Sequence, residues 1–263
     1  MINDYFNTPE TARLFTINQL DSFDAIWDLQ SDWFEEPNYR RSGWSGVIKL
    51  VLTGEHGEAH PVFIKRQENH NCKTLLHPFR GIPTFRREFK NIRRLCGHQI
   101  PTLTSLFYAE RVVNGKHRAI LVTESLEGFL STEDYWNQFP ELNSILRKWI
   151  LQRTGQVLRN LHDVNFQHNS LYPKHIFVRF DDITAAENQD VRLIDLEKLK
   201  WMPSRQHIRR GDLARIIRRA APMNRTDLKT LIDSYLSTNK DLSDTPLAEE
   251  LQHMLDKQFN PPE

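Results

Sequence analysis

The chain has little of what marks several common protein classes. It contains only two cysteines, Cys72 and Cys96, which cannot form a framework of several disulfides. A structural metal site also needs more ligands than two sulfurs, although the 11 histidines leave room for one. Because disulfide-poor chains are typical of reducing surroundings, we expect a reducing compartment.

Long apolar runs and a net excess of charge are lacking too. No run approaches the roughly 20 residues of a membrane-spanning helix, and the first ten residues, MINDYFNTPE, lack the basic and apolar regions of a signal peptide. The formal net charge is +1, and no nucleic-acid-binding motif is present. We therefore expect a cytoplasmic protein that at most rests on a membrane, with no transmembrane segment and no nucleic-acid partner.

Basic residues are concentrated in two segments. These are RREFKNIRR (86–94) and RQHIRRGDLARIIRR (205–219). Solvated helix faces are the common explanation for such runs, and contact with an anionic glycolipid is the alternative.

The front half of the chain has the pattern of an antiparallel sheet with one helix. Gly43 and Gly46 are predicted to lie in a turn before an apolar strand, and VFIK (62–65) continues the hairpin. Apolar residues at helical spacing predict a helix over 84–95. Asn114-Gly115 between two apolar runs predicts a second hairpin.

The back half is predicted to be mostly helical. A stripe of apolar residues over 145–161 indicates a helix with one buried face. Two short strands (176–180 and 191–194) flank a polar excursion, and three further helices and a frayed tail at 260–263 follow. The predicted organisation is an N-terminal extension (1–36) with a short helix at Ile26, Leu29 and Trp33, a β-rich lobe (37–125) and a helical lobe (126–263), with a cleft between the lobes.

The segment LHDVNFQHNSLYPKHIF (161–177) is a candidate for carrying the chemistry, and capping of a helix is the alternative. It is a polar loop between a long helix and a strand, and Asp195 ends the next strand, in VRLIDLEK. Loops at strand ends are common places for catalytic groups. Lys65 ends an apolar strand and Glu88 lies on the predicted helix; an exposed lysine and a surface pair of Glu88 with Arg87 or Arg94 are the plainer interpretations.

In this order, the motifs resemble those of protein-kinase-like phosphotransferases. HNSLYPKH (168–175) aligns without gaps with the catalytic-loop pattern H-R-D-L-x-x-x-N, and DLE at Asp195 stands where D-F-G is expected. Together with EEPNYRRSGWSGV, FIKR, FRREF, LYPKHIF and RRGDLARI, these residues resemble the lipopolysaccharide core kinase family, most closely its InaA-type branch. The resemblance covers about residues 35–221 and implies an α+β, two-lobed, protein-kinase-like fold.

The resemblance also implies roles for individual residues. Lys65 would contact the α- and β-phosphates of ATP, and Glu88 would hold the lysine through an ion pair. The segment from Ser42 to Gly46, with Gly43 and Gly46, would cover the phosphates. Asp195 would bind Mg²⁺, a cation that prefers carboxylate oxygen.

Further roles follow for the residues of the loop and of the helix beyond it. His175 stands at the second metal-ligand position, with a buried structural histidine as the alternative. His168 is expected to be structural. Asp212 would brace the loop from below, unless it serves only as a carboxylate at a helix start.

The chain departs from the family pattern at the catalytic base. Ser170 stands where the base aspartate is expected, Asn169 replaces the preceding arginine, and Asp163 is poorly spaced to substitute. General-base help is typically worth about 10²–10⁴-fold in rate. Two functions are therefore predicted: an ATP-dependent kinase acting on a sugar of the lipopolysaccharide core at the inner membrane, or a stress-related pseudokinase that binds nucleotide or regulates.

Overall fold

The computed structural model describes residues 4–40, 43–75, 77–138, 144–179, 190–239 and 244–259. The chain divides into two compact units, one of Met1–Arg93 with Leu103–Glu127 and one of Arg94–Thr102 with Gly128–Glu263. The elements of the first unit are β1 (Tyr5–Phe6), α1 (Pro9–Ile17), α2 (Phe23–Trp27), β2 (Glu35–Arg40), β3 (Gly43–Thr53), β4 (Ala59–Glu68), β5 (Asn71–Thr74), β6 (His77–Pro83), α3 (Thr84–Gly97, whose last turn belongs to the second unit), β7 (Ser105–Val113) and β8 (Lys116–Glu124).

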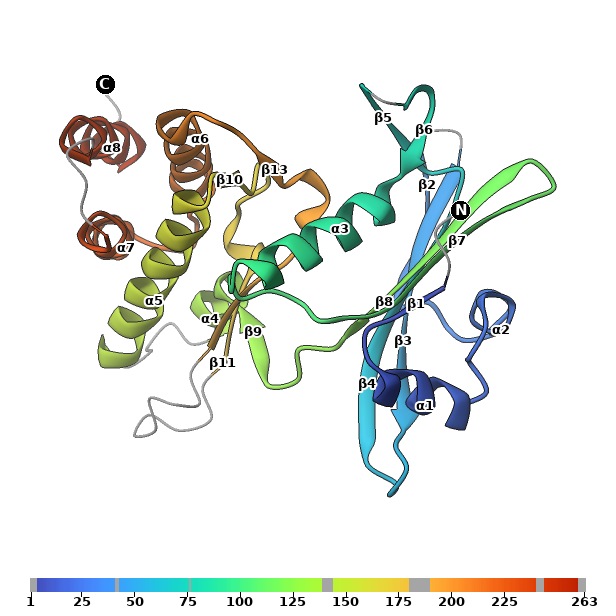
Figure 1. The fold of residues 1–263 in the computed structure, drawn as a ribbon. Coiled ribbons are helices and arrows are strands. Elements are labelled where there is room, and N and C mark those ends of the chain that lie inside the picture. Colours follow the sequence, from blue (N-terminus) through green and yellow to red (C-terminus); the bar gives the residue numbers. More distant parts are fainter. Residues whose placement is uncertain are drawn as a thin grey trace. The chain divides into compact units, whose positions relative to one another are not determined.

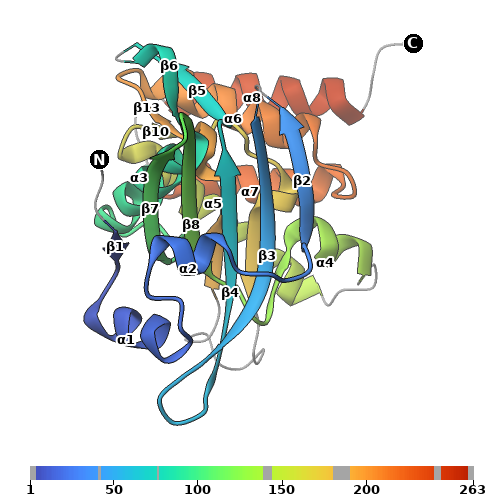
Figure 2. The ribbon, with the colours of Figure 1, turned by 90° about the vertical axis from the view of Figure 1, so that its right-hand side faces the viewer.

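The first unit is built on a six-stranded antiparallel sheet. Its strand order is β1-β7-β8-β4-β3-β2, which Figure 2 shows almost face on. Side chains alternate between the two faces of a strand, so Val62 and Ile64 of β4 pack into an apolar core with α1 and α2. Lys65 and Gln67 point to the opposite face, where they meet α3.

The N-terminal residues complete that core. The Thr8 and Ser22 side chains cap α1 and α2, and Phe15 and Ile26 are fully buried against the sheet. The predicted single helix through Ile26, Leu29 and Trp33 is wrong, because α2 ends at Trp27. Leu29 and Trp33 follow without helical structure and still pack against the same core.

The predicted turn at Gly43 and Gly46 is also wrong. Gly43 and Gly46 both lie within β3, where Gly43 pairs with Arg40 across the hairpin. A Cβ on Gly43 would lie 2.1 Å from the Glu68 carbonyl oxygen, and one on Gly46 would lie 2.7 Å from the Trp33 ring. Both glycines therefore allow close packing. Ser42, predicted to cover phosphates, lies outside the described residues.

Gly43→Ala is expected to destabilise the protein by about 2–3 kcal/mol, since the new methyl group overlaps backbone atoms that cannot rotate away. Gly97→Ala is the control, because a Cβ there meets no atom within 4 Å. Urea unfolding of both variants tests this. Equal midpoints would show that the β3 backbone adjusts at little cost.

The second unit is mostly helical. Its elements are β9 (Phe129–Ser131), α4 (Thr132–Gln138), α5 (Ser144–Asp163), β10 (Phe166–Gln167), the 3₁₀ turn η1 (Pro173–His175), β11 (Ile176–Arg179), β12 (Asp190–Leu193), the 3₁₀ turn η3 (Leu196–Lys198), β13 (Lys200–Trp201), α6 (Arg205–Arg218), α7 (Arg225–Ser237) and α8 (Asp244–Phe259). Its sheets have the orders β12-β11-β9 and β10-β13, and α5 lies beside α7 (Figure 1).

The helices and strands predicted for both halves are confirmed, with ends shifted by a few residues. Most of the polar excursion at 181–190 and the tail at 260–263 lie outside the described residues. The architecture is the predicted α+β, protein-kinase-like one, with α1 and α2 added to the β-rich unit.

Candidate active site

In the first unit, Lys65 and Glu88 form an ion pair. Lys65 Nζ lies 2.6 Å from Glu88 Oε1, with 19% and 6% of the two side chains exposed. The pair joins the middle of the sheet to α3, so the plainer interpretations of both residues are wrong. Such a pair fixes a lysine ammonium group while leaving its other protons free to donate.

The two glycines lie on the strand next to that lysine. Val47 is the register partner of Lys65, and Gly46 is the partner of Arg66. Gly43 is the first residue of β3 and pairs with Arg40, the last residue of β2. The first unit thus brings Gly46 and Lys65 onto neighbouring strands.

In the second unit, the loop after β10 is held by Asp212 of α6. This carboxylate is fully buried and accepts hydrogen bonds from the backbone N–H groups of His168 (2.6 Å) and Asn169 (2.9 Å). Burial alone would raise the pKa of Asp212, but the bond from His162, the neighbouring histidines and the Asn169 N–H outweigh it and lower that pKa. The bracing predicted for Asp212 is confirmed, and Asp212 is more than a helix-start carboxylate.

His162 extends this brace to α7. Its Nε2 lies 3.3 Å from Asp212 Oδ2, and its Nδ1 lies 2.9 Å from the Tyr235 hydroxyl. With Nε2 protonated, the ring donates to Asp212 and accepts from Tyr235, so both ring nitrogens of this fully buried side chain are satisfied.

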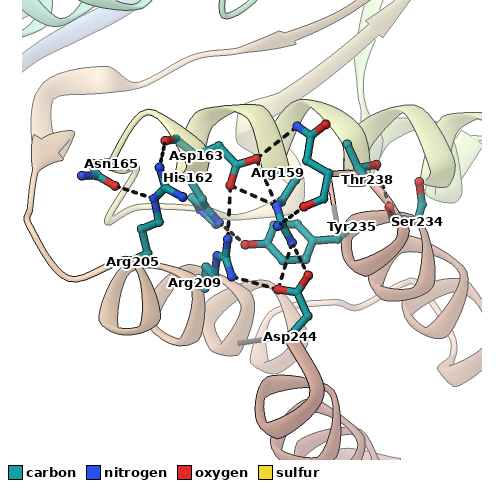
Figure 3. A network of polar contacts seen from close by, with 11 residues as sticks. Arg159, His162, Asp163, Asn165, Arg205, Arg209, Ser234, Tyr235, Thr238 and Asp244 are labelled. Carbon is teal, nitrogen blue, oxygen red and sulfur yellow. Dashed lines mark hydrogen bonds and ion pairs between the residues drawn. The ribbon is translucent and has the colours of Figure 1, made fainter. Parts of the chain in front are cut away.

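A network of charged side chains lies beside His162 (Figure 3). The Asp163 carboxylate accepts hydrogen bonds from Arg159, Arg209 and Asn239, and Asp244 at the start of α8 binds both arginines. Because these hydrogen bonds occupy its carboxylate, Asp163 does not replace the missing base.

The network also explains part of the second basic run. Arg209 is buried within it, and Arg205 donates to the Asp163 carbonyl oxygen and to Asn165 (Figure 3). Arg210 forms an ion pair with Glu250, and Arg215 binds Asp212 and Asn169. These arginines hold the helices and the loop in place.

Asn169 and His168 give the loop its shape. Asn169 has φ 63°, a conformation that asparagine tolerates better than most residues, and its Oδ1 accepts from Arg215 at 2.8 Å. His168 is completely buried, its Nε2 lies 2.9 Å from the Ile194 carbonyl oxygen, and burial lowers its pKa. The structural role predicted for His168 is confirmed.

Ser170, His175 and Asp195 converge at the end of this loop. Ser170 Oγ lies 3.4 Å from Asp195 Oδ2, and His175 Nε2 lies 3.5 Å from the same oxygen. Asp195 adopts the left-handed conformation (φ 57°, ψ 57°) directly before η3, and its side chain is 40% exposed. Ser170 is almost fully buried, so its hydroxyl faces the carboxylate from inside the fold.

The donor set suits a cation. His175 Nδ1 lies 2.7 Å from the Ser170 carbonyl oxygen, which requires a proton on Nδ1. In the neutral ring the lone pair is then on Nε2 and faces the Asp195 carboxylate. Among the residues that the structure describes, no cluster of three or more His, Cys, Asp or Glu side chains is arranged as a metal site. Asp195 and His175 would accordingly share a Mg²⁺ ion with nucleotide phosphates, as is usual for this ion.

Asp212→Asn is expected to destabilise the second unit by about 2–3 kcal/mol at neutral pH, because the amide loses the charge and its NH₂ group replaces the acceptor of one of the two backbone N–H groups. Because the pKa of Asp212 is lowered in the folded state, the ionised carboxylate adds to the free energy of unfolding above about pH 4, and this stabilisation is lost as pH falls through the folded-state pKa. The difference from wild type should therefore narrow in acid.

Chemical unfolding across pH measures this difference. The control is Asp233→Asn, which removes an exposed carboxylate paired with Lys229 on α7 and should change stability little. A pH-independent difference for Asp212→Asn would contradict the role of the charge.

Two supporting residues were missed from the sequence. Arg215 lies one helical turn after Asp212, so an i,i+3 ion pair was foreseeable. Tyr235 gave no signal, because its bond to His162 joins residues that are 73 positions apart.

In the first basic run, two arginines contact side chains of the same unit. Arg86 binds Glu110, and Arg93 lies over the rings of Tyr5 and Phe89, so these two arginines act within the fold. Over the described ranges, no helix combines the length and the hydropathy that crossing a bilayer requires.

Comparison with known proteins identifies relatives over most of the chain. Protein InaA of Escherichia coli K12 is 33% identical over 195 residues, which are 72% of this chain and 82% of that protein. Lipopolysaccharide core heptose(I) kinase WaaP of Pseudomonas aeruginosa is 24% identical over 187 residues, which are 69% of this chain and 66% of that protein.

A solved structure and a family model complete the comparison. The structure of WaaP in complex with acyl carrier protein matches with a TM-score of 0.67 at 19% identity, over 98% of this chain and all of that one, so the two share a fold. The model of the lipopolysaccharide kinase (Kdo/WaaP) family matches residues 24–235. The chain therefore belongs to the lipopolysaccharide kinase (Kdo/WaaP) family.

Proposed function

We propose that the protein is an ATP-dependent phosphotransferase that phosphorylates a sugar hydroxyl of the lipopolysaccharide core at the cytoplasmic face of the inner membrane. The observation that carries the proposal is the Lys65–Glu88 pair, a lysine ammonium group fixed by a buried carboxylate. Phosphoryl transfer depends mainly on positioning the phosphates and neutralising their charge, and this pair is built for that task. The core-sugar acceptor is taken from the activity in the name of the WaaP relative.

Each proposed contact follows from the chemistry of the side chain. Lys65 binds the α- and β-phosphates of ATP, and the backbone of β3 at Gly43 and Gly46, on the strand next to Lys65, covers the phosphates. Asp195 and His175 hold Mg²⁺, which supplies charge neutralisation at the phosphates. Ser170 forms a hydrogen bond with the acceptor hydroxyl, and the proton that this hydroxyl loses on phosphorylation passes to solvent.

A second candidate function is nucleotide binding without transfer, as in a regulatory pseudokinase with a role in stress. Ser170 favours it, because a hydroxyl does not accept a proton at neutral pH as a carboxylate does. Asp163 is bound to Arg159 and Arg209 and therefore does not take over as the base. Both functions require Mg²⁺ and ATP to bind, and they differ in whether phosphate moves.

Transfer of labelled phosphate from ATP to purified core oligosaccharides tests the proposal. The P. aeruginosa WaaP protein serves as the positive control for the acceptor, and Asp195→Ala as the inactive variant. Label on the sugar with wild type and none with Asp195→Ala supports the kinase. Bound ATP without transfer, under conditions where WaaP transfers, supports the second function instead.

A further inference from the structure

The hairpin of β5 and β6 stands apart from the large sheet and leads directly into α3 (Figures 1 and 2). Its base is firmly held. Residues 81–84 are buried, the Thr84 hydroxyl donates to Gln67 Oε1 at 2.8 Å, and a Cβ on Gly81 would lie 2.6 Å from the Cys72 carbonyl oxygen. The hairpin tip, defined here as residues 73–75 and 77–80, is therefore carried on a fixed support.

The hairpin tip presents large apolar side chains to solvent. Leu75 is 100% exposed and Phe79 is 91% exposed, the two highest values among the large apolar residues of the described chain. Single exposed apolar residues are ordinary, whereas a close group of them usually marks an interaction surface. The Thr74 side chain accepts from the His77 backbone N–H and so closes the turn between these two residues.

The charge around these side chains is of one sign. No Asp or Glu occurs in the sequence from residue 69 to residue 87. Lys73 and Arg80 are exposed, and no carboxylate of the described residues forms an ion pair with either one. Arg86 and Arg87 contact Glu110 and Cys72 instead. The tip thus combines two exposed apolar groups with two exposed cationic groups.

We propose that the hairpin tip binds an anionic lipid bilayer, with Leu75 and Phe79 entering the head-group region and Lys73 and Arg80 contacting lipid phosphates. A bilayer accepts side chains that stand out from a convex turn and needs no matching surface, and its negative charge complements the tip. An acidic protein is less well matched, because Leu75 and Phe79 are almost fully exposed side chains that stand out from the hairpin instead of forming a surface on which a partner would rest. The inference goes beyond the proposed function, since the hairpin tip shares no residue with the candidate active site.

Co-sedimentation with vesicles tests the proposal on the full chain. Wild type is expected to bind vesicles of phosphatidylglycerol and phosphatidylethanolamine, and to bind vesicles of phosphatidylcholine weakly. The double variant Leu75→Ser/Phe79→Ser should bind the anionic vesicles at least about tenfold more weakly, since it lacks the two apolar side chains whose transfer from water into the bilayer favours binding. The double variant Lys73→Glu/Arg80→Glu should lose about as much affinity for the anionic vesicles, and added salt should weaken the binding of the wild-type protein to them.

Matched variants separate the hairpin tip from the rest of the surface. Val51→Ser/Val112→Ser removes two other exposed apolar side chains, and Arg13→Glu/Lys257→Glu makes the same change of charge elsewhere. Both are expected to bind as wild type does. Because the replaced tip residues are exposed, circular dichroism should show every variant folded.

Contact with lipid is measured directly with Phe79→Trp. Its fluorescence, after subtraction of the wild-type signal, should be quenched by brominated lipid. The proposal is wrong if wild type binds no anionic vesicle, if the tip variants bind them as wild type does, or if the tip binds only an acidic protein. If the wild-type protein bound anionic vesicles but did not bind ATP, the proposed function would be refuted and the membrane proposal would stand.

Discussion

Replacing Lys65 with methionine is expected to abolish the stabilisation of the protein by Mg²⁺ and ATP, a loss in affinity of about 100-fold or more, since a fixed cation at the phosphates is removed. The variant should also lose about 3 kcal/mol of stability, because it leaves the Glu88 carboxylate buried without its cation. Lys65→Met/Glu88→Met should recover most of the stability and none of the ATP binding. Thermal unfolding with and without nucleotide measures both quantities.

A second buried pair between α3 and the sheet provides the control. Arg86 Nη2 lies 2.7 Å from Glu110 Oε2, with side-chain exposures of 19% and 3%, close to those of the Lys65–Glu88 pair. Arg86→Met should lower the free energy of unfolding by less than Lys65→Met does, because His117 remains beside Glu110. It should leave the stabilisation by ATP intact. If both variants lost ATP binding equally, the effect would be one of folding and Lys65 would have no special role.

Replacing Ser170 with aspartate is expected to raise ATP-dependent phosphate transfer, by up to about 10²–10⁴-fold if the rest of the site is functional. A carboxylate at this position can accept the proton of the attacking hydroxyl, which the serine hydroxyl does not. The new carboxylate faces Asp195, whose Oδ2 is 3.4 Å from Ser170 Oγ. Like charges so close are unfavourable without a cation, so the variant should depend more strongly on Mg²⁺ than wild type.

Ser170→Asn is the matched control, since asparagine has the shape of aspartate without its charge. Initial rates with labelled ATP compare the three proteins. A higher rate for the aspartate variant alone would mean that the missing base limits the rate of phosphate transfer by the wild-type protein. Equal rates for the aspartate and asparagine variants would mean that the remaining groups do not form a phosphotransfer site.

Local patterns in the sequence were enough to predict most of the elements. The Asn114-Gly115 turn and the apolar spacing in α3 and α5 depend on neighbouring residues, and the observed elements agree with the predictions. Gly43 and Gly46 were placed in a turn because glycine permits turns; their actual cause is the close approach of Glu68 and of Trp33, which are distant in sequence. The β5–β6 hairpin was not predicted, since β6 does not alternate between buried and exposed residues: its first four residues, Phe79 among them, are exposed and its last three are buried.

The candidate site shows the same limit. The motifs indicated Lys65, Glu88, Asp195 and Asp212 through resemblance, but the distances between partners come from the fold. Lys65 and Glu88 are 23 residues apart, and Asp212 lies 44 residues from the His168 backbone that it holds. Sequence alone left each residue with a plain alternative, and tertiary contacts removed the alternatives for Lys65, Glu88 and Asp212. The roles of Ser170, His175 and Asp195 toward nucleotide and metal stay predictions.

The central claim is that the chain carries a kinase-type site for ATP and Mg²⁺. Thermal unfolding of wild type and Asp195→Ala, with millimolar ATP in the presence and absence of Mg²⁺, tests it most directly. A ligand at about 100 times its dissociation constant stabilises the folded state by about 2.7 kcal/mol, so wild type should melt several degrees higher with both present. Asp195→Ala should lose the part of the rise in melting temperature that depends on Mg²⁺. An unchanged melting temperature of wild type would contradict the claim.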